Sequence, residues 1–198
     1  MKRSMPMIAA LAVVSACGEN AQRQNVLQTA VENSQSGRPG SVPGTTAPAR
    51  SSQYSPVSDE ACEVIESSEE TGDWTGRCPG VAGYRVEWSS SDLRDDLTLI
   101  EGETRTPLQI PALVAKGAFN SPGPKIEWRG PTGGAPDVLV VRVHVANPEG
   151  VSDSGRLAIF RLKPAICLVA IVPPQSGQSE RARAIADGKL PDCLAAAD

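Results

Sequence analysis

The alternation of apolar residues between positions 139 and 145 constrains the fold more than any other feature of the chain. The apolar positions are Leu139, Val141, Val143 and Val145. A period of two is typical of a β-strand with one buried face. Arg142 and His144 occupy the intervening positions, so we expect them to share the opposite face, next to Val140.

Four further segments have strand patterns separated by turn signals. They cover residues 84–88, 126–129, 157–162 and 167–172. The last segment is apolar throughout, which is typical of a central strand buried on both faces. A helix is expected over 177–187, where apolar residues recur at helical spacing before Gly188. Strands followed by one helix predict an α+β fold: a small, antiparallel, β-rich domain with a C-terminal helix.

The first residues resemble a bacterial export signal. Basic residues precede an apolar run over 8–14, which is too short to span a bilayer. The word Val-Ser-Ala-Cys that ends at Cys17 resembles a lipobox. This resemblance implies lipidation of Cys17 and a membrane anchor, and Gly18 in the next position favours the outer membrane. The alternative is ordinary cleavage after a small residue, with Cys17 incidental.

The next segment is rich in Gln, Asn, Ser, Gly, Pro and Thr and has few large apolar side chains. Such a composition cannot bury enough surface to offset the entropy of ordering. We therefore expect a signal peptide over 1–16, a lipidated cysteine with a disordered tether over 17–56, and a folded domain over 57–198.

The remaining cysteines indicate two disulfides, because an even number in an exported chain is typical of a covalent framework. Four cysteines allow three pairings. We expect the local ones: Cys62 with Cys78 around the turn signal at 70–73, and Cys167 with Cys193. Zinc is disfavoured, because no C-x-x-C occurs and the single histidine lies elsewhere. No metal or cofactor is expected.

Several short words resemble a known group of proteins. They are Arg77-Cys78-Pro79-Gly80, Gly83-Tyr84-x-Val86, Ser91-Asp92-Leu93-Arg94 and Ile126-Glu127-Trp128-Arg129, followed by Cys167 and Cys193. Over residues 62–193 this pattern is similar to uncharacterised exported proteins of alphaproteobacteria. The resemblance implies an envelope location and the cysteine pattern, and it implies no activity, ligand or catalytic residue.

The sequence contains no nucleophile elbow, P-loop or dinucleotide-binding glycine motif. Any imidazole chemistry must use His144. Carboxylates could form a pair at 69–70 or among Asp92, Asp95 and Asp96, although the last three are interpreted as a solvated turn. We expect Arg142 and His144 to contact an acidic group of a ligand.

The net charge of −4 and the absence of a basic cluster disfavour nucleic acid as a partner. The favoured function is an envelope lipoprotein with a non-catalytic domain that binds a protein, glycan or cell-wall component. One alternative is a hydrolase or other enzyme that uses His144 or a carboxylate pair. A second is a lysozyme-inhibitor-like protein, since small lipidated β-domains with disulfides do that job.

Overall fold

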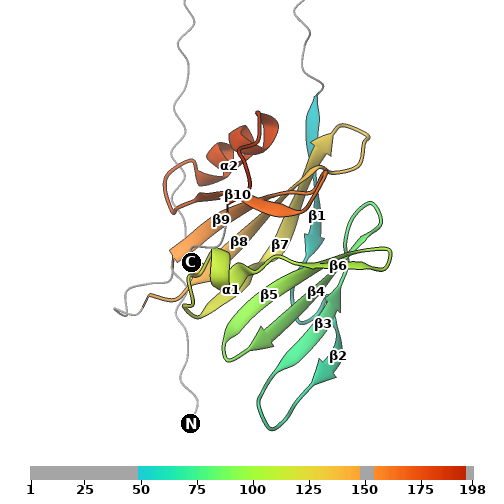
Figure 1. The fold of residues 1–198 in the computed structure, drawn as a ribbon, viewed down its shortest axis with the longest axis vertical. Coiled ribbons are helices and arrows are strands. Elements are labelled where there is room, and N and C mark those ends of the chain that lie inside the picture. Colours follow the sequence, from blue (N-terminus) through green and yellow to red (C-terminus); the bar gives the residue numbers. More distant parts are fainter. Residues whose placement is uncertain (1–48, 148–153, 195–198) are drawn as a thin grey trace, which may run out of the picture. The chain divides into compact units, whose positions relative to one another are not determined.

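A computed structural model describes residues 49–147 and 154–194, which belong to one compact unit. Ten strands form a sheet, with two helices beside it (Figure 1). The elements are β1 (Arg50–Pro56), β2 (Glu63–Ser67), β3 (Trp74–Cys78), β4 (Tyr84–Ser91), β5 (Arg94–Glu101), β6 (Thr104–Pro107), α1 (Ile110–Leu113), β7 (Asn120–Pro131), β8 (Val138–Val145), β9 (Ser154–Arg161), β10 (Cys167–Val172) and α2 (Gln178–Asp187). The expected α+β class, the dominant antiparallel pairing and the late helix are confirmed. The four-residue helix α1 was not anticipated.

The sheet bends where β7 meets β5. The strand order is β10-β9-β8-β7-β5-β4-β3-β2, with β1 also paired to β7 and β6 also paired to β5. The pairing of β5 with β7 is parallel and joins only Arg94 to Asn120. This short contact separates a first half-sheet (β1 and β7–β10) from a second half-sheet (β2–β6), as Figure 1 shows.

Both half-sheets contribute to the main core. The second half-sheet supplies Val86, Leu97 and Leu99, and the first supplies Leu139, Val141, Val143, Val145, Trp128 and Phe160. The predicted inner face of β8 is therefore confirmed. Trp128 is only 1% exposed, donates from Nε1 to the Ser55 hydroxyl at 2.8 Å, and stacks on Tyr84 with ring centroids 5.5 Å apart. This ring fixes the two half-sheets against each other.

Helix α2 covers the outer face of the first half-sheet. Its Ala182 and Ala186 pack with Val138, Val140, Leu157, Ile159, Val169 and Val172 in a second core cluster. Val140 is therefore buried, although it lies on the face expected to be outward. Strand β10 lies at the end of the sheet, so its expected central position is wrong. It is apolar throughout because Leu168 faces the main core and Val169 faces α2.

The predicted start of the domain at Val57 is too late. Strand β1 lies in the segment expected to be tether, and it pairs with β7 from Arg50 opposite Pro131 to Pro56 opposite Lys125. Its sequence, RSSQYSP, has no apolar alternation. The strand depends instead on backbone pairing and on polar contacts to β7.

Both local disulfide pairings are confirmed. Cys62–Cys78 closes the β2–β3 hairpin with its Cα atoms 4.1 Å apart, and Cys167–Cys193 ties the segment after α2 to β10. The proposed signal peptide, Cys17 and most of the tether lie outside the described residues. No helix in the part of the chain that the structure describes is both long and apolar enough to cross a membrane.

Candidate functional site

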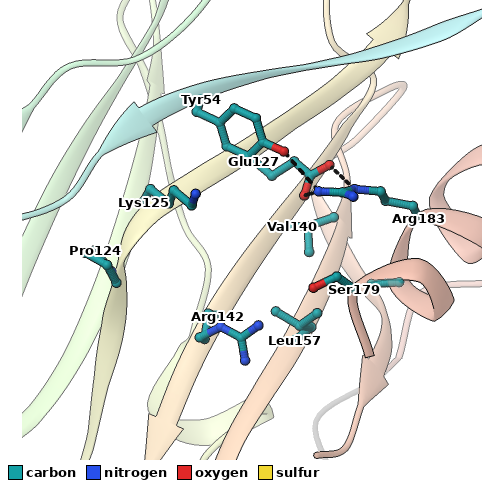
Figure 2. A pocket seen from close by; sticks show the side chains of 10 residues that line it. Tyr54, Pro124, Lys125, Glu127, Val140, Arg142, Leu157, Ser179 and Arg183 are labelled. Carbon is teal, nitrogen blue, oxygen red and sulfur yellow. Dashed lines mark hydrogen bonds and ion pairs between the residues drawn. The ribbon is translucent and has the colours of Figure 1, made fainter. Parts of the chain in front are cut away.

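A groove of about 340 Å³ lies between α2 and the outer face of the first half-sheet (Figure 2). We call it the α2 groove. Its polar lining comprises Tyr54 from β1, Lys125 and Glu127 from β7, Arg142 from β8, and Ser179 and Arg183 from α2. Val140, Leu157 and Ala182 form its apolar floor. The groove thus joins an apolar floor to charged side chains from three elements, β7, β8 and α2.

Arg142 is held in place by glycines on both neighbouring strands. A Cβ atom on Gly123 would lie 2.9 Å from the Cβ of Arg142, and one on Gly155 would lie 3.2 Å from its Nη1 atom. The same Nη1 donates to Oε1 of Gln178 at 3.0 Å. Gln178 in turn donates to the carbonyl oxygens of Gly155 and Val172. The guanidinium is therefore oriented by α2 before any ligand arrives.

The single carboxylate of the groove is already paired. Arg183 donates to Glu127 through Nε at 2.8 Å and through Nη2 at 3.2 Å, and the Ser52 hydroxyl donates to the same carboxylate at 2.5 Å. Burial alone would raise the pKa of Glu127, but the hydrogen bonds from Arg183 and Ser52 outweigh it, so the pKa is lowered. Glu127 therefore remains ionised and is occupied by Arg183.

Two cations in the groove lack a carboxylate partner. Lys125 places Nζ 5.0 Å from the centroid of the Tyr54 ring, and neither Lys125 nor Arg142 forms an ion pair with any described residue. Figure 2 shows both side chains at the groove, opposite Ser179 of α2. Such an arrangement of donors suits a carboxylate or phosphate group.

A network of ion pairs fixes the far end of α2. Asp187 accepts from Arg129 Nη2 at 2.6 Å and from Arg50 Nε at 3.0 Å. Arg50 also pairs with Asp137 at the start of β8. The hydrogen bond from Arg129 lowers the pKa of Asp187. These contacts join α2 to β1 and β7. They hold the helix at a fixed distance from the sheet, so the groove has its width before a ligand binds.

His144 lies on the same outer face as Arg142 but lines a different hollow, of about 320 Å³, with Asp95, Asn120 and Ser121 among its neighbours. In the described residues no hydrogen bond joins His144 to a carboxylate. Asp95 instead accepts from Nε1 of Trp88 at 2.9 Å. A catalytic imidazole usually needs such an orienting partner. Arg142 and His144, which we expected to contact one ligand group together, thus line separate hollows.

The interpretation of Asp92, Asp95 and Asp96 as a solvated turn holds only for Asp92, which is exposed. Asp95 is 7% exposed, and burial raises the pKa of both Asp95 and Asp96. Asp96 accepts from the backbone N–H groups of Leu97, Gln109 and Ile110 and so orders the start of α1. Asp95 and Asp96 lie within β5, beyond the turn, and both accept hydrogen bonds from other residues of the fold.

Sequence reasoning missed Lys125, Glu127 and Arg183 as members of the site. Lys125 and Glu127 alternate on one face of β7, and Ser179 and Arg183 are spaced by one helical turn. Those spacings could have placed each pair on a face of its own element. The sequence held no signal for how α2 docks on β8–β10, and this docking brings Arg183 of α2 to Glu127 of β7.

In residues 49–147 and 154–194, no group of three or more His, Cys, Asp or Glu side chains could hold a metal ion. The chain matches no protein-family model, and neither the curated proteins nor the solved structures contain a significant match. The resemblance to exported alphaproteobacterial proteins therefore stays a prediction, and the α2 groove carries the functional argument.

Proposed function

We propose that this protein is a cell-envelope lipoprotein whose domain is a non-catalytic binding module, and that the α2 groove binds an anionic group of its ligand. The observation that carries the proposal is the presence of Lys125 and Arg142 in a groove whose one carboxylate is occupied by Arg183. A bound carboxylate or phosphate would supply the missing partner.

The arrangement favours binding over chemistry. Arg142 is oriented by Gln178, and α2 is clamped at Asp187, so little conformational freedom is lost when a ligand binds. Each charge-assisted hydrogen bond would contribute roughly 1.5–3 kcal/mol. A lipid anchor on Cys17 and a flexible tether, both proposed from the sequence, would hold the module near anionic glycans or lipids of the envelope and raise their effective concentration.

The binding proposal is tested by calorimetric titration of the full chain with two anionic probes, a carboxylated polysaccharide and inorganic polyphosphate. We expect Arg142→Gln and Lys125→Gln each to weaken binding by about tenfold, as for loss of one charge-assisted contact. Arg85→Gln is the matched control, because Arg85 is exposed on β4, outside the groove. An equal loss in all three variants would reduce the interaction to general charge attraction and contradict the proposal.

The anchoring proposal has a separate test. Cys17→Ser should move the protein from the membrane pellet to the soluble fraction, because the lipid attachment atom is removed. Cys167 and Cys193 remain paired in this variant, so the folded domain is unchanged. Unchanged fractionation would remove the lipoprotein interpretation without affecting the groove.

A further inference from the structure

Strand β2 forms an open edge of the second half-sheet. It is the last strand in the sheet order, and all five of its residues are exposed. Val64 is 60% exposed and Ile65 is 41% exposed, which is unusual for apolar side chains in a strand. In the part of the chain that the structure describes, no strand pairs with its outer side. An edge of this kind can hydrogen-bond to another extended chain.

The edge is strongly acidic. Residues 59–73 contain seven carboxylates and no lysine or arginine, and two of the seven, Glu63 and Glu66, lie on β2 itself. A second copy of this chain would bring like charges together across the new pair of strands, which is destabilising. A segment with Lys or Arg would bring opposite charges together. Charge therefore selects a basic partner and rejects an acidic one.

A hollow of about 280 Å³ adjoins the end of this edge and is lined by Glu66, Asp73 and Trp74, together with serines of β4. Trp74 is held edge-on against Trp88 with ring centroids 4.6 Å apart. Among the described ion pairs none involves Glu66 or Asp73. Two carboxylates beside an aromatic ring suit a cationic side chain.

We propose that β2 pairs with an extended, basic segment of a partner protein, and that one Lys or Arg of that segment enters the hollow between Glu66, Asp73 and Trp74. The Cys62–Cys78 disulfide clamps the hairpin at the start of β2 and so keeps the edge formed in the free protein. This surface is distinct from the α2 groove and takes a ligand of opposite charge.

The test uses the full chain and a fluorescent peptide of alternating Lys and Val, with an alternating Glu and Val peptide as the acidic control. We compare Glu66→Gln with Asp73→Asn, combined in one variant, against Glu69→Gln with Glu70→Gln in another. Both variants remove two charges from the hairpin, but only the first removes them from the hollow. We expect the first to weaken binding about tenfold and the second to change it by less than about threefold.

Hydrogen exchange supplies the backbone readout. Amides within residues 63–67 should gain protection when the basic peptide binds, because some of them would donate to the added strand. The proposal is overturned by any of three results: equal loss in the two double variants, equally tight binding of the acidic peptide, or binding without new protection in β2. Absence of measurable binding by the basic peptide overturns it as well.

Discussion

The α2 groove and the β2–β3 hairpin differ in charge and in construction. In the groove, cations outnumber the single carboxylate, and a helix covers the sheet. Along residues 59–73, which include β2 and its turn, seven carboxylates lie in one stretch without a cation, and the edge strand is uncovered. The net charge of −4 thus conceals two surfaces of opposite sign. Whole-chain charge therefore does not describe a local site.

The two regions also gain their stability differently. The first half-sheet is packed on both faces, by the main core and by α2. The hairpin contributes few buried side chains and is closed by Cys62–Cys78. Deep packing favours a preorganised site, whereas an exposed edge favours pairing with another chain.

Removing one tryptophan from each region should give the largest contrast. Trp128→Ala should lower the free energy of unfolding by about 3–5 kcal/mol, because it leaves a cavity between the half-sheets and strands the Ser55 hydroxyl. Trp74→Ala should lower it by about 1–2 kcal/mol, since that ring is half-buried and mainly contacts Trp88. Urea unfolding measures both values. Equal losses would contradict the difference in packing.

A smaller effect is expected from the groove carboxylate. Glu127→Gln should lower the free energy of unfolding by about 1–2 kcal/mol, because Arg183 and Ser52 lose an ionised acceptor. The same variant should bind polyphosphate more tightly than the parent, because Arg183 becomes available to the anion. Urea unfolding and calorimetry measure the two quantities. Weaker polyphosphate binding by Glu127→Gln would contradict this, because it would mean that Glu127 itself supports ligand binding and does not compete with the ligand for Arg183.

Acid should affect α2 and strand β5 in opposite directions, whereas Glu87 of β4, whose pKa is lowered by hydrogen bonds from Arg105 and Arg77, should lose its contribution with acid as α2 does. The pKa values of Glu127 and Asp187 are lowered in the folded protein, so the stability they contribute is present above about pH 4 and is lost as the pH falls through their folded values. Burial raises the pKa of Asp95, so its ionisation costs stability as the pH rises. Hydrogen exchange between pH 6 and 3 should therefore show α2 losing protection before β5. Simultaneous loss of amide protection in α2 and β5 would contradict the opposite pKa shifts of Asp187 and Asp95.

Half of the strands could be predicted, because β4 and β7–β10 have apolar strand patterns, whereas β2, β3, β5 and β6 were not predicted. Leu139 to Val145 is the clearest case, and the helix before Gly188 follows from its apolar spacing. Strand β1 could not be predicted, since its short polar side chains carry no period and its pairing with β7 depends on backbone groups. Strand β10 was misplaced because burial by α2 resembles burial within a sheet.

The candidate site was predicted only in part. Arg142 was placed on the correct face, because alternation along β8 determines it. Its true neighbours are Lys125, which the pairing of β7 with β8 places next to it, and Arg183, which the docking of α2 brings into the groove. His144 was grouped with Arg142 by sequence spacing, yet it lines a second hollow with Asp95, Asn120 and Ser121, apart from α2.

The most direct test of the account is a map of backbone amide chemical-shift changes during titration of the full chain with inorganic polyphosphate. We predict that the changes cluster around Lys125, Arg142 and the first turns of α2, that Arg142→Gln moves their midpoint to about tenfold higher polyphosphate, and that His144→Ala changes the affinity by less than about threefold, as expected for a side chain outside the groove. Changes spread over exposed cations such as Arg85, or loss of binding in His144→Ala with full binding in Arg142→Gln, would contradict the account.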